Sequence, residues 1–226
     1  LLETEPLEFI HNPAPQDTMT IVYTSGSTGK PKGVVISYDN LAAAATETTA
    51  CFSAIPEDRV MSYLPLAHIT ERSIIETLSF YAGCKVFFTE NLDTFIEDVK
   101  VAQPTVFGSV PRLWTIFRAQ VLSKMPERKL SLLLKIPILK KLVAKKIRIA
   151  LGLNHARLFV SGTAPISPAI LEWYQNIGIP ISEAWGMTET SGMSCCNQPF
   201  NADAIGSIGK PIACVERCKS ERIRKF

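Results

Sequence analysis

Short apolar runs alternate along the chain with segments in which apolar residues recur at helical spacing. The runs predict strands at 20–23, 34–37, 59–64, 85–89, 105–109, 157–161, 180–184 and 212–216. The helical spacing predicts helices at 40–52, 69–81, 92–102 and 168–176, and another that opens at Pro111. Regular alternation of this kind favours an α/β fold, with a mostly parallel sheet and helices on both faces.

Residues that begin or end helices support these boundaries. We expect Asp39 to cap the N-terminus of the 40–52 helix, because its carboxylate can accept backbone N–H groups. Gly83 and Pro104 are expected to end helices, and Pro111 stands at a first helical position, where proline is tolerated. Ligands of such sheets bind beyond the carboxyl ends of the strands, so motifs in those loops carry the most functional weight.

The loop at 23–33 is the richest of these motifs and reads Tyr-Thr-Ser-Gly-Ser-Thr-Gly-Lys-Pro-Lys-Gly. Its backbone N–H groups, hydroxyls and ammonium groups suit the oxygens of a triphosphate. It is not a Walker A loop, because Lys30 is followed by Pro31 and not by a hydroxyl residue that opens a helix. A mobile linker is the alternative, but the strands predicted on either side indicate a loop held at both ends.

A second motif, at 184–190, follows the strand predicted at 180–184. Trp185 offers a flat face on which a nucleotide base can stack, and Gly186 permits close backbone approach. Thr188 offers a hydroxyl to a phosphate, and Glu189 is a hard oxygen ligand suited to Mg²⁺. Singly, a tryptophan is more often core and a glutamate more often surface, so the combination carries the prediction.

Two weaker motifs occupy 161–165 and 64–72. In the first, Gly162 allows close backbone approach just after a predicted strand, although an ordinary strand-to-helix turn explains it equally well. In the second, Arg72 follows His68 by about one helical turn, so the two side chains can share a face. The simpler interpretation of His68 is a residue that caps a helix N-terminus.

Composition and charge limit the classes of protein to which this chain can belong. The 226 residues suffice for a sizeable core, and a net charge of +3 gives no reason to expect a nucleic-acid partner. No apolar run reaches transmembrane length. Six cysteines show no CxxC pairing, so we expect reduced structural thiols in a cytoplasmic protein. They stand at 51, 84, 195, 196, 214 and 218.

Positive charge is concentrated in one segment, 124–148, which carries nine Lys or Arg against one Glu. Pro137 is expected to break the helix there, and 138–151 then shows an apolar stripe at 139, 142, 143, 147 and 150 with lysines largely off it. One interpretation is a surface helix that packs its stripe on the domain. The other is a basic amphipathic helix that touches the cytoplasmic face of an anionic membrane.

The motifs, taken together in this order, resemble the adenylate-forming (AMP-binding) enzymes, and within them the long-chain fatty acyl-CoA synthetases. The family resemblance rests on YTSGSTGKPKGV at 23–34, WGMTET at 185–190 and GSIGKP at 206–211. LPLAHITER at 64–72, VPRLW at 110–114 and SGTAPIS at 161–167 favour the long-chain branch. The resemblance implies the central part of the large N-terminal domain of such an enzyme.

This resemblance implies ATP, Mg²⁺, coenzyme A and a long-chain fatty acid as ligands. It assigns the β- and γ-phosphates of ATP to Thr24, Ser25, Gly26, Ser27, Thr28, Gly29, Lys30 and Lys32. It assigns the adenine side to Gly162, Thr163, Ala164, Pro165, Trp185 and Gly186. By the same resemblance Thr188 contacts the α-phosphate, Glu189 binds Mg²⁺, and His68 lies near the reacting carboxylate and the thiol entry path. Trp185 stands where many relatives have tyrosine.

The resemblance also implies that this chain is part of a longer enzyme. We expect a connecting segment at 1–18, a partial AMP-binding domain at 19–216 and an irregular tail at 217–226. The aspartate that binds the ribose and the small C-terminal lid with its lysine have no counterpart here. We therefore expect these residues alone to be a far poorer catalyst than a complete enzyme.

Three other functions remain open from the sequence. Another adenylating enzyme, acting on a different carboxylate, shares the first two motifs. A remnant that binds nucleotide or membrane without turnover is consistent with the irregular tail. A P-loop NTPase is disfavoured by Lys30-Pro31.

Overall fold

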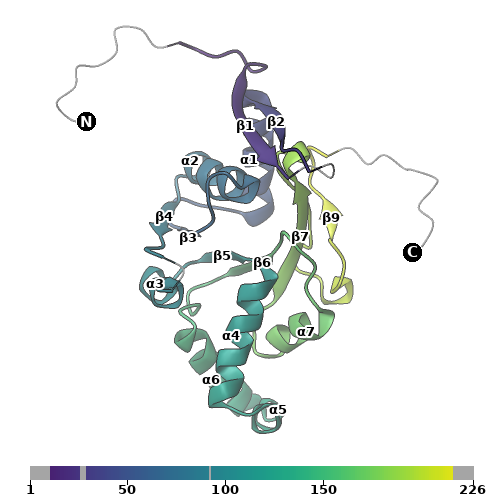
Figure 1. Ribbon diagram of the computed structural model, residues 1–226. Coiled ribbons are helices and arrows are strands. Elements are labelled where there is room, and N and C mark those ends of the chain that lie inside the picture. The colour runs from purple at the N-terminus through teal and green to yellow at the C-terminus, as the bar shows by residue number, and fades with distance from the viewer. Residues whose placement is uncertain (1–10, 26–28, 92, 216–226) are drawn as a thin grey trace, which may run out of the picture.

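A five-stranded sheet forms the centre of the computed structural model, which describes residues 11–25, 29–91 and 93–215 (Figure 1). Its strands follow in the order β5 (Val106–Ser109), β6 (Leu158–Ser161), β7 (Ile181–Met187), β8 (Gly192–Cys196) and β9 (Lys210–Pro211). β5, β6 and β7 run parallel, whereas β8 and β9 continue the sheet in antiparallel fashion.

Two smaller sheets accompany it. β3 (Arg59–Ser62) and β4 (Lys85–Phe88) pair in parallel, and β1 (Thr18–Thr24) and β2 (Lys32–Ser37) form an antiparallel hairpin. The predicted α/β class is confirmed, and the parallel pairing holds for the strands that helices connect. The antiparallel pairs β1–β2 and β7–β8 join strands separated by short loops, which suit a hairpin and not a crossover, whereas β9 returns to β8 after a longer segment that contains η3.

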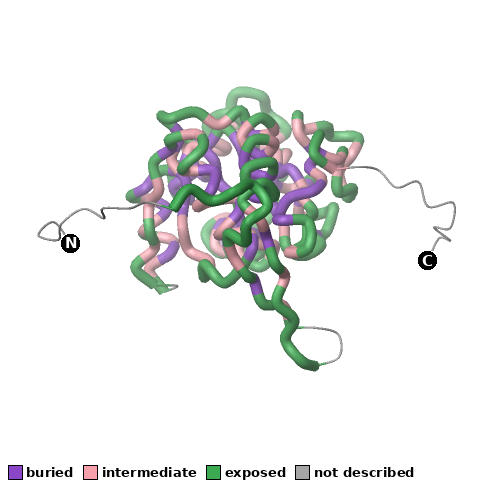
Figure 2. Tube along the Cα trace, turned by 90° about the horizontal axis from the view of Figure 1, so that it is seen from above, coloured by how far each residue is buried: buried purple, intermediate pink, exposed green. Residues whose placement is uncertain are grey.

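Helices provide the connections between the parallel strands. In the described part of the chain the α-helices are α1 (Tyr38–Phe52), α2 (Thr77–Ala82), α3 (Phe95–Ala102), α4 (Pro111–Lys124), α5 (Glu127–Leu134), α6 (Pro137–Ala150) and α7 (Pro168–Asn176). A π-helix, η1 (Thr70–Glu76), and two 3₁₀ turns, η2 (Thr188–Thr190) and η3 (Ala202–Ala204), complete the set. Buried segments occupy the interior, and exposed loops and helix faces surround them (Figure 2).

The predicted cap of α1 is wrong by two residues. Ser37, not Asp39, is the N-cap: its hydroxyl oxygen accepts the Asn40 N–H at 3.2 Å. The Asn40 side chain accepts the Ser37 N–H at 3.3 Å in return. This reciprocal pair satisfies two backbone donors, and it begins the helix earlier than the apolar pattern alone predicts.

The helix predicted at 69–81 is present but is not regular. It begins as the π-helix η1 and tightens into α2, and Gly83 ends it at φ 69° as expected. The Thr77 hydroxyl donates to the carbonyl oxygens of Arg72, at 2.9 Å, and of Ser73. A π-helix of this length is rare and commonly marks a functional segment.

The strand predicted at 212–216 is wrong. Pairing stops at β9 after Pro211, because the chain turns at once: the Val215 N–H donates to the Ile212 carbonyl at 3.1 Å. Glu216 and the tail predicted at 217–226 lie outside the described residues.

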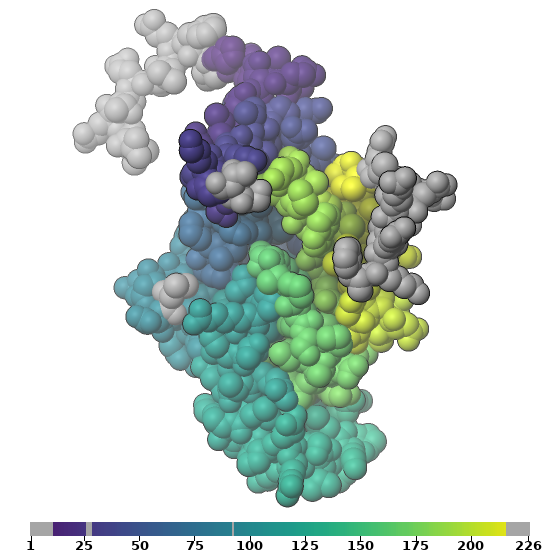
Figure 3. All heavy atoms as spheres, turned by 45° about the vertical axis from the view of Figure 1, so that its right-hand side comes forward, coloured from purple at the N-terminus to yellow at the C-terminus, as the bar shows by residue number. Residues whose placement is uncertain are grey.

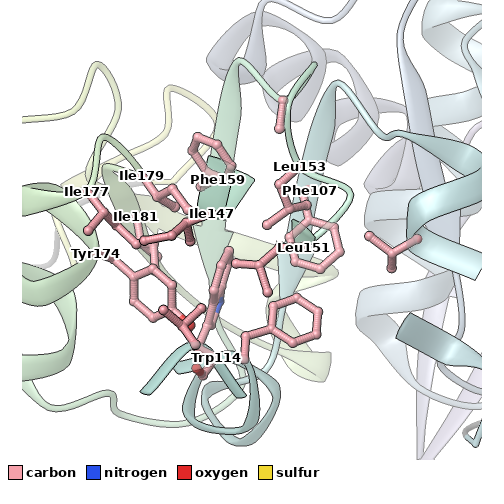
Figure 4. Packing of buried hydrophobic residues seen from close by; sticks show 14 of the residues in the cluster. Phe107, Trp114, Ile147, Leu151, Leu153, Phe159, Tyr174, Ile177, Ile179 and Ile181 are labelled. Carbon is pink, nitrogen blue, oxygen red and sulfur yellow. Dashed lines mark hydrogen bonds between the residues drawn. The ribbon is translucent and has the colours of Figure 1, made fainter. Parts of the chain in front are cut away.

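The main core lies between the parallel strands and helices α4, α6 and α7 (Figure 4). Trp114 is fully buried at its centre, with ring centroids 5.3 Å from Phe107 and 5.1 Å from Tyr174 in edge-to-face arrangements. The Tyr174 hydroxyl donates to the Trp114 carbonyl, so the phenol is buried with a partner. Burial raises the pKa of Tyr174.

A buried carboxylate, Asp58, holds the amino ends of the strands together. It accepts hydrogen bonds from Arg157 Nε at 3.1 Å, the Thr105 hydroxyl at 2.6 Å and the Ile55 N–H at 3.0 Å. Burial alone would raise the pKa of Asp58, but the bonds from Arg157, Thr105 and Ile55 outweigh it and hold the pKa below its usual value.

Backbone bonds around Asp58 fix the strands relative to one another. The Arg59 N–H donates to the Thr105 hydroxyl oxygen at 2.9 Å, and the Arg157 N–H donates to the Thr105 carbonyl at 2.8 Å. The Lys85 N–H donates to the Asp58 carbonyl at 2.8 Å. One polar cluster therefore aligns the starts of β3, β4, β5 and β6.

Replacing Asp58 with Asn should lower the free energy of unfolding by about 1.5–3 kcal/mol near neutral pH, because the buried carboxylate loses its charge-assisted hydrogen bonds from Arg157 and Thr105. The folded-state pKa is depressed, so the stabilisation exists above the unfolded pKa of about 3.9 and is lost as the pH falls through the folded value. Urea unfolding of wild type and variant across this range measures it. Asp93→Asn, at an exposed position, is the control, and equal midpoints for wild type and Asp58→Asn contradict the assignment.

Candidate functional site

One cavity, of about 210 Å³, opens at the carboxyl ends of β5, β6 and β7. This is where an α/β sheet is expected to bind a ligand. The cavity brings together six of the residues singled out in the sequence, from three separate segments. They are His68, Gly162, Thr163, Trp185, Gly186 and Thr188. The roles of these residues remain predictions. They lie together because the parallel strands end at the same edge of the sheet.

The rest of the cavity wall is mainly apolar. It includes Phe52, Val60, Ile74, Ile75, Leu78 and Met193, which come from α1, β3, the helical segment 70–82 and β8. The polar motif residues therefore face a space that an apolar group can enter.

Trp185 and Thr188 are positioned by the tight β7–β8 hairpin. A Cβ atom on Gly186 would lie 1.8 Å from the Gly192 carbonyl oxygen, so only glycine permits this approach of the two strands. The sequence suggested that Gly186 makes room for a ligand, whereas here it makes room for the protein backbone. Trp185 is 42% exposed and lines the cavity, so its indole face remains available for stacking.

The turn after β6 has a strained backbone. Thr163 lies on the cavity wall with φ 71°, in the left-handed region that non-glycine residues rarely adopt. Such strain commonly accompanies ligand contact. Ala164 and Pro165 are exposed and do not line the cavity.

His68 combines the two interpretations that the sequence left open. Its Nδ1 accepts the Thr70 N–H at 3.1 Å, which is a capping contact at the start of η1. In the neutral ring the proton therefore sits on Nε2. The side chain also lines the cavity. Arg72 does not pair with His68: it donates to the Glu76 carboxylate at 3.2 Å.

Glu71 is a cavity residue that the sequence reasoning passed over. It is only 1% exposed, and its carboxylate accepts the Leu64 N–H at 3.2 Å. Burial raises the pKa of Glu71, and hydrogen bonds from Ser62 and from the Leu64 and Tyr63 backbone offset only part of that effect. Glu71 precedes Ile74 by three residues and Ile75 by four, so in a helix it shares their face, and that spacing was the signal.

The segment that carries Glu71 is tied to the β7–β8 hairpin. The Ser73 hydroxyl donates to the Ser191 carbonyl at 2.6 Å, and a Cβ on Gly192 would lie 2.6 Å from Ser73 Oγ. The His68 segment and the Thr188 segment thus form one packed unit around the cavity.

The first loop motif lies apart from this cavity wall. Thr24 ends β1 opposite Lys32, and its hydroxyl donates to the Lys32 carbonyl at 3.4 Å. Ser25, Gly29, Lys30 and Lys32 are exposed. Gly26, Ser27 and Thr28 lie outside the described residues. The β1–β2 hairpin therefore holds the loop motif at both ends, as we predicted from the strands on either side of it.

Glu189 is exposed on η2 and is not part of the cavity wall. Within residues 11–25, 29–91 and 93–215, no three His, Cys, Asp or Glu side chains gather as a metal site. A Mg²⁺ ion bound by Glu189 would therefore take its other ligands from phosphate oxygens or water, which is how Mg²⁺ is commonly held.

Comparison with known proteins identifies the class. A family model described as AMP-binding enzyme matches residues 3–218, and the chain therefore belongs to the AMP-binding enzymes.

Individual relatives are consistent with this assignment. The long-chain-fatty-acid–CoA ligase 5 of Mus musculus is 33% identical over 225 residues, which are 89% of this chain and 32% of that protein. The peroxisomal acyl-CoA ligase 891 of Penicillium roqueforti is 34% identical, over 91% of this chain and 32% of that ligase. The crystal structure of ATP-bound MatB from Rhodopseudomonas palustris superposes with a TM-score of 0.66 at 27% identity, over 88% of this chain and 35% of that one. The chain spans about a third of the length of these proteins.

Replacing Glu71 with Ala should destabilise the protein by about 1–3 kcal/mol and speed amide exchange at Leu64, because the Leu64 N–H loses its acceptor. Glu71→Gln keeps an oxygen acceptor and should exchange almost as slowly as wild type. Hydrogen exchange followed by mass spectrometry measures both. Glu76→Ala, which removes only the half-exposed Arg72 pair, is the control, and similar exchange in all three variants contradicts the role.

Proposed function

We propose that the protein to which this chain belongs activates a long-chain fatty acid with ATP, first to an acyl-adenylate and then to acyl-CoA. The single observation that carries the proposal is the cavity in which the polar motif residues meet apolar walls at the carboxyl ends of the sheet. Its polar rim suits a nucleotide and a carboxylate, and its apolar wall suits an alkyl chain. The fatty-acid and acyl-CoA ligases among the relatives support the same reaction.

In this proposal each motif has a separate task. Trp185 stacks on the adenine beside Gly162 and Thr163, and Thr188 donates to the α-phosphate. The hydroxyls and lysines of the 24–32 loop bind the terminal phosphates. Glu189 would hold Mg²⁺, which when bound would supply positive charge near the phosphates. His68 lies on the acyl side of the cavity, where its Nε2 proton can orient the reacting carboxylate or the entering thiol.

The task of these groups is positioning and neutralisation of charge. A carboxylate is a poor electrophile, and its conversion to a mixed anhydride with AMP provides a good leaving group for thiol attack. The enzyme must hold the carboxylate in line with the α-phosphorus and stabilise the negative charge on pyrophosphate. We also propose that residues 1–18 form a connecting segment and that residues 19–216 form part of an AMP-binding domain. We propose a cytoplasmic location for the enzyme.

Replacing Thr188 with Ala in the full-length protein should slow fatty-acid-dependent ATP–pyrophosphate exchange about 10²-fold or more, because a donor to the reacting phosphate is lost. Thr46→Ala, on the exposed side of α1, should leave the rate unchanged. Exchange measured with long-chain, short-chain and amino acids identifies the carboxylate. Preference for another acid would favour a different adenylating enzyme, and nucleotide binding without exchange would favour a non-catalytic module.

A second proposal concerns the α5–α6 face, defined by Leu132, Ile136, Ile138, Leu142 and Ile149. We propose that this face contacts an anionic membrane surface. Ile138 is 74% and Leu142 53% exposed, while Ile147 on the other side of α6 is buried. The stripe predicted along α6 is therefore corrected: Leu142 and Ala150 face outward. Figures 1 and 3 show α5 and α6 at the end of the molecule opposite the β1–β2 hairpin.

Charge supports a lipid partner for this face. Five exposed lysines surround it: Lys135, Lys140, Lys141, Lys145 and Lys146. None of them forms an ion pair with a residue in the described ranges. In those ranges no helix is long and apolar enough to cross a bilayer. Exposed apolar side chains ringed by unpaired lysines suit the interface of an anionic bilayer.

Changing Lys141 and Lys145 to Glu should weaken binding to vesicles that contain phosphatidylserine by about tenfold or more, at roughly 1 kcal/mol per basic residue. Vesicle flotation with and without the anionic lipid measures the binding of wild type and variant. Lys85 and Lys210 changed to Glu give the same change in charge elsewhere and should have little effect. Equal flotation of the two double variants would remove the proposal.

A further inference from the structure

Two cysteines far apart in sequence lie together beside the cavity. Cys51 is the penultimate residue of α1 and is half-buried, and Cys196 ends β8 and is 2% exposed. Both belong to the core cluster that packs α1 against β8. Each thiol is the main electrostatic neighbour of the other, and neither cysteine forms a disulfide. Neither the proposed reaction nor the membrane face uses them.

The two thiols differ in character. The hydrogen bond from Cys196 lowers the pKa of Cys51 in spite of opposing effects of burial and Glu47, whereas the same bond and burial raise the pKa of Cys196. The other ionisable groups that act on the pair are Cys195, the neighbour of Cys196 in β8, and Glu47, whose charge also acts on Cys214. A half-buried sulfur with thiolate character next to a second thiol is the arrangement found at oxidation-sensitive sites.

We propose that Cys51 and Cys196 are a redox modification site that closes to a disulfide when the protein meets a peroxide. The proposal rests on the packing of two free cysteines, one from α1 and one from β8, in the same core cluster and on their unequal burial. It does not depend on the proposed ligase activity.

The chemistry takes two steps with hydrogen peroxide as the oxidant. The Cys51 thiolate attacks one peroxide oxygen, the O–O bond breaks, and the second oxygen leaves as hydroxide, which takes a proton to become water. Cys51 is then a sulfenic acid. The Cys196 sulfur attacks the Cys51 sulfur, the S–O bond breaks, and the hydroxyl group leaves with the Cys196 proton as a second water. Two thiols lose two electrons and two protons in all, and the peroxide is reduced to two molecules of water.

A disulfide between Cys51 and Cys196 would affect the cavity wall directly. Phe52 follows Cys51 in the chain, Ala184 is the register partner of Cys196, and Met193 lies on the same strand as Cys196. All three line the cavity. A covalent link between α1 and β8 would therefore fix two walls that are otherwise joined only by packing.

The experiment treats the purified protein with hydrogen peroxide, blocks remaining thiols by alkylation, and maps peptides without reduction. We expect a cross-linked peptide that contains Cys51 and Cys196, equal loss of free thiol at both residues, and complete reversal by dithiothreitol. In Cys196→Ser, dimedone should label Cys51 as a trapped sulfenic acid. In Cys51→Ser, the Cys196 thiol should remain alkylatable.

Cys84 is the matched control, since it is buried in the same core cluster and its pKa is raised by burial. Cys84→Ser should leave the cross-link unchanged. Dimedone labelling of wild type at short times needs no substitution and covers the case in which a serine variant does not fold. The proposal is overturned if Cys51 is oxidised no faster than Cys84, or if Cys51 is linked to Cys214 or Cys195 and not to Cys196.

Discussion

The buried Asp58 carboxylate, paired with the more exposed Arg157, is the constraint on which the rest of the architecture depends. A charge this deep is stable only with partners, and its partners are the residues that start the neighbouring strands and end α1. Because parallel strands are aligned at their amino ends, their carboxyl ends also finish together. The position of the cavity is thus set from the opposite edge of the sheet.

At that carboxyl edge the protein joins a π-helix to a tight hairpin. Ser73 and Gly192 hold η1 against the start of β8, so the histidine loop and the tryptophan–threonine loop move as one body. The β1–β2 hairpin, by contrast, presents its glycine-rich loop from the surface.

Much of the fold was predictable from local patterns. The period of apolar residues located β1 to β7 and most helices, and the bounds of α7 were predicted without error, but β8, β9 and α5 were not predicted. Errors arose where side chains or tertiary contacts overrode the pattern. Ser37 and Asn40 moved the start of α1, and the turn after Pro211 replaced a strand. For the site, sequence spacing supplied the motif residues but not the residues that surround them. Glu71 lies inside the 64–72 motif without an assigned role, and apolar wall residues such as Phe52, Leu78 and Met193 come from segments outside the motifs.

The sequence by itself determined the α/β class, the order of the elements and the chemical character of each loop, because these depend on residues close together in the chain. Only the tertiary structure decided that His68, Thr163 and Thr188 share one cavity, that Leu142 faces outward, and that Cys51 meets Cys196. These contacts join residues many positions apart, so they depend on strand order and helix packing. A local pattern carries no information on distance between segments, and packing alone fixes it.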